Sequence, residues 1–124
     1  MNTYAENYLI AVAALDAAIE IENEFEEKFL SDKGYSNKRV YTIENENEFD
    51  RLNEELGNLL ESNVISARRY EATENKVAAE EELIKFALSI VPAKEKAILE
   101  KAAKTNWKVR NQIIDLALKY EPSL

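Results

Sequence analysis

The chain has 124 residues, 46% of them hydrophobic and 32% charged, which is a globular composition with enough length for one modest hydrophobic core. It contains neither Cys nor His, which excludes disulfides, thiolate nucleophiles, zinc–thiolate sites and imidazole general bases. The formal net charge of −8 disfavours direct binding to DNA or RNA, because proteins bind phosphates largely through clustered Lys and Arg.

Turn-forming residues are scarce, since the chain has only two Gly and two Pro. An all-β domain needs a turn signal every ~8–12 residues, so the sequence favours few, long helices instead. We therefore predict one all-α domain over residues 1–124. It is expected to be a helical bundle of three to four long helices with one short extended connector at about residues 35–43. A second copy of the chain could complete this bundle, which makes a homodimer one expected state.

The first predicted helix covers residues 3–31. Thr3 and Glu6 have the spacing of a capping box at its start, and Gly34 follows its end, where a left-handed residue commonly closes a helix. The apolar run Tyr8–Ile21 contains two acidic residues, lacks a preceding basic segment and is too short to span a bilayer. We therefore expect no membrane segment and no targeting signal, and a cytoplasmic location.

The stretch of residues 35–43 is the predicted interruption between helices. Within it, Arg39–Ile43 is rich in residue types typical of strands, but no second strand is evident to pair with it. Two interpretations stay open: a short strand, or an extended connector that packs on the helices.

The second predicted helix covers residues 45–91, with Asn45 and Glu48 as its capping signature. Its apolar stripe turns polar at Asn63, Ser66 and Thr73, which predicts either one long helix or two collinear halves broken within residues 61–75. A helix of this length cannot easily bury its whole stripe within one chain, so dimerisation through it is expected.

The third predicted helix covers residues 93–120 and has an apolar face that includes Ile98, Ile113 and Leu116. Its basic residues allow a second interpretation, a DNA-binding helix-turn-helix with its turn at Thr105–Asn106. The turn lacks Gly, and a single amphipathic helix with a charged outer face explains the same residues. We therefore favour one helix and expect no direct binding of nucleic acid.

Catalytic signatures are incomplete. All-α magnesium-dependent nucleotide hydrolases combine Glu-x-x-Glu on one helix with Glu-x-x-Asp on the next, because carboxylates three residues apart project from one helix face. Glu24–Glu27 and Glu71–Glu74 supply the first half of that pattern, and no Glu-x-x-Asp occurs. No Ser stands in a nucleophile motif, and the Gly residues are isolated. We assign no catalytic, cofactor-binding or metal-binding residue and expect no enzyme.

Acidic residues gather in the N-terminal half of the chain. Residues 1–62 contain 15 Asp and Glu against 5 Lys and Arg, whereas residues 63–124 contain 9 against 11. If the first two helices pack antiparallel, the acidic end of one and the acidic start of the other lie at the same end of the bundle. The predicted partner-binding acidic face consists of Glu22, Glu24, Glu26, Glu27, Glu46, Glu48 and Asp50.

Such a face suits a partner protein with a basic surface. Carboxylates spaced along helices can imitate the charge pattern of a nucleic-acid backbone and occupy a basic groove. In size and charge the chain resembles small phage-encoded inhibitors of restriction and CRISPR enzymes, which is a likeness of composition. It implies a non-enzymatic binding protein that occupies the nucleic-acid-binding surface of its target.

Two alternatives belong to other classes of protein. The first is a structural or assembly protein whose long helices build an oligomer and whose acidic face keeps it soluble. The second, more distant alternative is a magnesium-dependent all-α nucleotide hydrolase.

Overall fold

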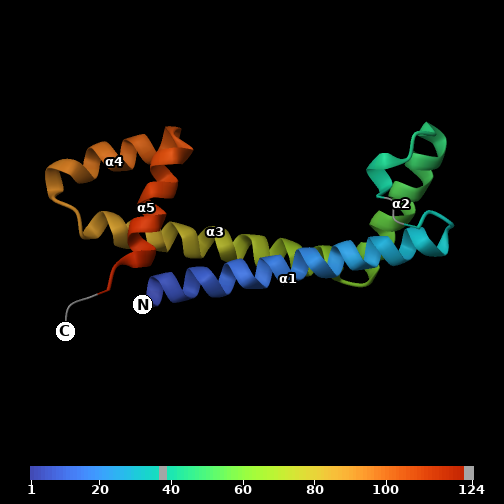
Figure 1. Ribbon diagram of the computed structural model, residues 1–124, viewed down its shortest axis with the longest axis horizontal. Helices are drawn as coiled ribbons and strands as arrows, with labels where there is room; N and C mark the ends of the chain where they lie inside the picture. Colours follow the sequence, from blue (N-terminus) through green and yellow to red (C-terminus); the bar gives the residue numbers. More distant parts are fainter. Residues whose placement is uncertain (37–38, 122–124) are drawn as a thin grey trace. The chain divides into compact units, whose positions relative to one another are not determined.

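The computed structural model describes residues 1–36 and 39–121. In these ranges it contains five α-helices and one short 3-10 helix, and no strand (Figure 1). The all-α class is therefore confirmed, whereas a bundle of three to four long helices is not. The elements in chain order are α1 (Thr3–Asp32), η1 (Val40–Thr42), α2 (Glu46–Ser62), α3 (Ile65–Ser89), α4 (Ala93–Thr105) and α5 (Trp107–Lys119).

The chain divides into two compact units. The central unit comprises Ala14–Thr73, and the terminal unit comprises Met1–Ala13 together with Glu74–Leu124. Each unit contains its own cluster of buried apolar side chains. The expectation of one domain over residues 1–124 stays a prediction.

Helix α1 is capped by Asn2, and the predicted capping box of Thr3 and Glu6 is wrong. The Asn2 side-chain oxygen accepts a hydrogen bond of 2.8 Å from the Ala5 backbone N–H. Its side-chain amide donates to the carbonyl oxygens of Ala117 (2.8 Å) and Tyr120 (2.9 Å). Asn serves well as an N-cap because its oxygen satisfies an N–H that has no partner within the helix. Here the same side chain also satisfies carbonyls at the end of α5.

The predicted long helix of residues 45–91 is two helices, α2 and α3. The Asn45 side chain accepts from the Glu48 N–H at 3.0 Å, as the capping signature indicates. The break falls at Asn63–Val64, within the predicted range, and Val64 has a left-handed backbone with φ of +63°. The continuous helix on which the expected dimerisation rested is therefore absent.

Of the two interpretations of Arg39–Ile43, the short strand is wrong, because Val40–Thr42 forms the 3-10 helix η1. Val40 is buried in the central unit, and Arg39, which directly precedes η1, contacts α1. Its guanidinium donates to the Asn23 side-chain oxygen at 2.7 Å and pairs with Glu26 at 3.1 Å. Of the predicted connector, residues 37 and 38 lie outside the described ranges.

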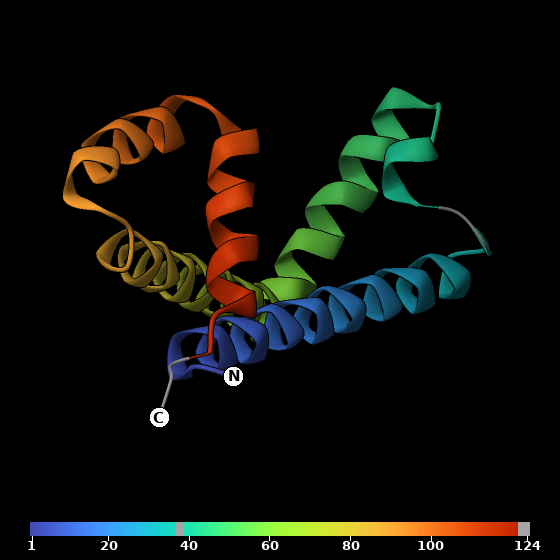
Figure 2. The same cartoon turned by 60° about the vertical axis from the view of Figure 1, so that its left-hand side comes forward.

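The prediction of one helix over residues 93–120 is also wrong. Asn106 has an extended backbone, with φ of −133°, and its side chain caps α5 by accepting from the Lys108 and Val109 N–H groups. The resulting hairpin turns α5 back onto α3 (Figure 2). Because the helix direction changes at Asn106, Ile98 and Leu116 are 70% and 66% exposed, although the sequence pattern placed both inward.

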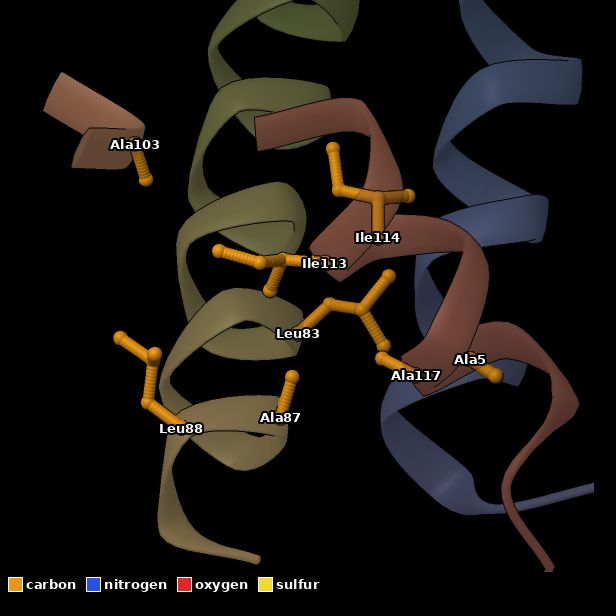
Figure 3. Close-up of a cluster of buried hydrophobic side chains, with 8 residues drawn as sticks. All are labelled: Ala5, Leu83, Ala87, Leu88, Ala103, Ile113, Ile114 and Ala117. Atoms are coloured by element: carbon orange, nitrogen blue, oxygen red, sulfur yellow. The ribbon is translucent and has the colours of Figure 1, made fainter. Parts of the chain in front are cut away.

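The core of the terminal unit gathers small and branched side chains from four helices. Leu83 of α3 is fully buried and lies among Ile113, Ile114 and Ala117 of α5 (Figure 3). Burying one Leu or Ile stabilises a fold by about 1.5–3 kcal/mol. The Arg110 Nε donates to the Glu80 carboxylate at 2.8 Å and adds a charged link between α5 and α3. The other buried members of the cluster are Ala5, Ala87, Leu88 and Ala103.

The core of the central unit packs the end of α1 against α2 and η1. Its buried side chains are Phe29, Leu30, Val40, Leu52 and Leu56. An ion pair of 3.0 Å joins Lys33, which directly follows α1, to Glu55 of α2 outside this cluster. Ion pairs at such exposed positions contribute little, so the apolar cluster provides most of the stabilisation.

Candidate partner-binding surfaces

The net charge follows the division into units. The central unit contains 15 Asp and Glu against 7 Lys and Arg, a balance of −8, whereas the terminal unit contains 9 of each and is neutral. All seven residues of the predicted acidic face lie in the central unit, four on α1 and three on α2. The whole net charge of the chain therefore belongs to one compact unit.

Two members of the predicted face are engaged within the unit. Glu22 pairs with Arg69 at 2.8 Å, and Glu26 pairs with Arg39 and also accepts from the Val40 N–H at 3.0 Å. Both carboxylate side chains are largely covered, with 21% and 13% of their surface exposed. These contacts give Glu22 and Glu26 a structural role, which the sequence pattern alone could not separate from a surface role.

Four other members are exposed: Glu24 and Glu27 on α1, and Glu46 and Asp50 on α2. No ion pair joins any of them to another residue of the described ranges. The Glu48 side chain is half-buried, and its carboxylate lies 3.7 Å from the Arg51 guanidinium. The spacing of three residues on α1 and of four on α2 places each pair on one helix face. The acidic surface is therefore two pairs of exposed carboxylates on two helices of one unit.

The central unit contains a groove of about 280 Å³. Its walls mix the carboxylates of Glu22 and Glu26 with apolar side chains such as Phe49 and Leu56, and Tyr41 at its edge is 77% exposed. Because Arg69 and Arg39 already neutralise the two carboxylates, this groove is not a strongly acidic site.

The terminal unit contains a hollow of different character, which we call the apolar groove. It has a volume of about 330 Å³ and opens between the end of α3, α4 and α5. Sequence reasoning missed it, because the groove exists only when the chain turns at Asn106. Six of its eight lining residues are Leu88, Ile90, Leu99, Ile113, Leu116 and Tyr120.

Burial and neighbouring charges shift the pKa of Tyr8 in the terminal unit. Its partial burial raises the pKa of the phenol, and the nearby carboxylates of Glu80 and Asp115 raise it further, while Arg110 opposes them. Both effects favour the neutral phenol. Tyr8 packs against the core cluster, so this neutral ring is part of the fold.

In residues 1–36 and 39–121, no group of three or more acidic side chains is placed to hold a metal ion. The pairs Glu24–Glu27 and Glu71–Glu74 are thus not joined by a third carboxylate from these ranges. Within the same ranges, no helix combines the length and the apolar character needed to cross a lipid bilayer.

The comparisons with known proteins identify no relative. No protein-family model, no curated protein and no solved structure matches the chain.

Proposed function

We propose that the chain is a non-enzymatic binding protein whose central unit contacts a basic surface of a partner protein. The observation that carries this proposal is the concentration of the whole net charge of −8 in that unit. A solubilising charge needs no such concentration, whereas a surface that attracts a basic partner does.

The exposed carboxylates are the expected contacts. Glu24, Glu27, Glu46 and Asp50 have no partner of opposite charge in the described ranges, so binding a cationic surface would break no existing ion pair of theirs. Complementary charge of this kind mainly accelerates association and excludes partners of the wrong sign. Glu22 and Glu26 would support the surface indirectly, since their pairs with Arg69 and Arg39 hold α1, α3 and η1 together.

A nucleic-acid-binding surface is the proposed target, because its Lys and Arg side chains are arranged to meet a row of negative groups. The exposed carboxylates form one pair on α1, three residues apart, and one pair on α2, four residues apart. These pairs offer negative groups to such Lys and Arg side chains. An inhibitor of this type would compete with the nucleic acid of its target and would weaken as salt screens the charges.

Charge reversal with a matched control tests the proposal. The variant Glu24→Lys/Glu27→Lys/Glu46→Lys alters the central unit, and Glu74→Lys/Glu81→Lys/Glu95→Lys changes the net charge equally in the terminal unit, again at exposed residues. The partner is first isolated by affinity capture from the native host, and its affinity for each variant is then measured with both proteins purified.

We expect the central-unit variant to bind at least about tenfold more weakly, a change of about 1.4 kcal/mol, with unchanged helicity by circular dichroism. The terminal-unit variant should stay close to wild type. Equal losses in both variants would show that only net charge matters, and unchanged binding of the first variant would eliminate this surface.

A structural or assembly protein is the second candidate. It is favoured by the exposed apolar side chains of the terminal unit, among them Leu116 and Trp107, which are 66% and 68% exposed. Sedimentation over a concentration series separates the candidates, because an assembly protein forms oligomers by itself, whereas a strictly monomeric chain contradicts assembly.

A further inference from the structure

The apolar groove of the terminal unit is a candidate for a second interaction, independent of the acidic surface of the central unit. Its lining is entirely apolar or aromatic, and several of these side chains remain open to solvent. Leu116 is 66% exposed, Ile90 is 43% exposed and Tyr120 is 37% exposed. Apolar side chains gathered around one hollow, rather than scattered over a surface, mark interaction sites.

Helices α4 and α5, which contribute Leu99, Ile113 and Leu116 to the lining of this groove, carry a net positive charge. Residues 93–119 contain seven Lys and Arg against three Asp and Glu, a local charge of +4 within a neutral unit. Arg110 is engaged by Glu80, whereas the six lysines are exposed. The exposed lysines are Lys94, Lys96, Lys101, Lys104, Lys108 and Lys119. An apolar hollow formed in part by helices of net positive charge complements an apolar ligand with acidic flanks.

We propose that the apolar groove binds an acidic amphipathic helix of a partner protein. Such a helix would insert apolar side chains at intervals of three and four residues between α3, α4 and α5, and the lysines of α4 and α5 would attract its acidic residues. The lysines would add attraction and orientation, and the buried apolar side chains would supply most of the affinity.

Three other occupants fit these observations less well. A second copy docking through the same face would bring two local charges of +4 together, and the chain's own acidic helix α2 already buries its apolar stripe at Leu52 and Leu56. Nucleic acid would use the lysines but leave the apolar lining without a partner, since phosphate binding depends on charge.

Binding of a defined peptide to the full chain tests the proposal. The probe is a fluorescein-labelled peptide of roughly 18 residues, with Leu along one helix face and Glu at the other positions, and its affinity is measured by fluorescence anisotropy. A control peptide carries Lys in place of every Glu. We expect the acidic peptide to bind at least about tenfold more tightly than the basic one, and less tightly at higher salt.

Two matched variants locate the site. Leu116→Glu places a charge inside the groove, and Ile98→Glu makes the same change at a side chain that is 70% exposed and does not line it. We expect Leu116→Glu to weaken peptide binding at least about tenfold and Ile98→Glu to change it less than about twofold. If Leu116→Glu loses helicity, Ile90→Glu provides the test at another exposed position of the same groove.

Several outcomes would overturn the proposal. Equal affinity of the two peptides would remove the role of charge, and unchanged binding by Leu116→Glu and Ile90→Glu would remove the groove. A wild-type dimer that dissociates in Leu116→Glu would assign the groove to a second copy. Displacement of the peptide by a duplex of about 20 base pairs would assign the lysine-rich surface to nucleic acid.

Discussion

The side-chain amide of Asn2 donates a hydrogen bond of 2.8 Å to the carbonyl oxygen of Ala117, a residue 115 positions further along the chain. The Asn2 side chain is buried, and its oxygen caps α1 at the Ala5 N–H. One side chain therefore provides hydrogen-bond partners for a backbone N–H at the start of α1 and for backbone carbonyls at the end of α5. The rings of Tyr4 and Phe86 stack with their centroids 4.9 Å apart, and the ring of Tyr120 packs edge-on against Phe86 at a centroid distance of 5.5 Å.

The variant Asn2→Ala should lower the free energy of unfolding by about 1–3 kcal/mol, because it removes a helix cap and the two hydrogen bonds that the Asn2 amide donates to the Ala117 and Tyr120 carbonyl oxygens. Urea denaturation monitored by circular dichroism measures this. Asn2→Asp keeps the oxygen that caps α1 but places a carboxylate against two carbonyl oxygens, so it should also destabilise. Asn7→Ala, at an exposed position of the same helix, should change stability by less than about 0.5 kcal/mol.

Asn106 should matter for the hairpin of α4 and α5 in a similar way. The variant Asn106→Ala loses the oxygen that accepts from Lys108 and Val109, which should cost about 1 kcal/mol. Asn111→Ala, at an exposed position within α5, is the matched control and should cost nothing measurable. A cost that is the same for both variants would contradict the assignment of Asn106 as the cap.

These two asparagines show which parts of the fold the sequence could predict. The cap at Asn45 was predictable because its partner, Glu48, lies only three residues away and the two residues form a local capping signature. The turn at Asn106 was considered only as part of a helix-turn-helix, and one continuous helix was favoured over it because apolar residues continue in helical register on both sides. Asn2 was missed because its choice over Thr3 depends on contacts with Ala117 and Tyr120, which no local pattern contains.

The same limit applies to the candidate surfaces. The acidic character of α1 and α2 could be predicted from composition. It could not be predicted that Glu22 and Glu26 form ion pairs within the unit while Glu24 and Glu27 stay exposed. This difference depends on where Arg69 and Arg39 lie, and both belong to other elements of the fold. The apolar groove depends on tertiary structure in the same way.

Replacement of neighbouring carboxylates should reveal this difference. Glu26→Ala leaves the Val40 N–H without its acceptor and Arg39 without its ion-pair partner, which should cost about 1–3 kcal/mol. Glu24→Ala removes an exposed charge without a partner in the described ranges, and stability should change by less than about 0.5 kcal/mol. Equal effects in a thermal or urea melt would contradict the different roles assigned to the two residues.

Val64 joins α2 to α3 with φ of +63°, a conformation that costs an L-residue roughly 1–2 kcal/mol and is worst for a branched side chain. Its side chain is 52% exposed, so little buried surface is lost when it is replaced. Val64→Asn should therefore stabilise the protein by about 0.5–1 kcal/mol, because Asn tolerates this backbone. Val77→Asn, at a 47% exposed position inside α3, should not stabilise. Two melting temperatures that fall together would refute the assignment of strain to Val64.

Tyr8 predicts how stability responds to alkaline pH. Burial and the carboxylates of Glu80 and Asp115 raise the pKa of Tyr8 in the folded protein above its ordinary value of 10.0. Below pH 10 the phenol is protonated in both states. As the pH rises further, the unfolded chain loses this proton first, so the free energy of unfolding falls until the folded Tyr8 also ionises.

Urea midpoints measured from about pH 9 to about pH 11 test this dependence. The variant Tyr8→Phe retains the ring that packs on the core but has no proton to lose, so its stability should decline less steeply than that of wild type. Tyr41→Phe, at a side chain that is 77% exposed, should follow the wild-type decline. If all three proteins lose stability in parallel, groups other than Tyr8 cause the alkaline loss, and the desolvated phenol contributes nothing to it.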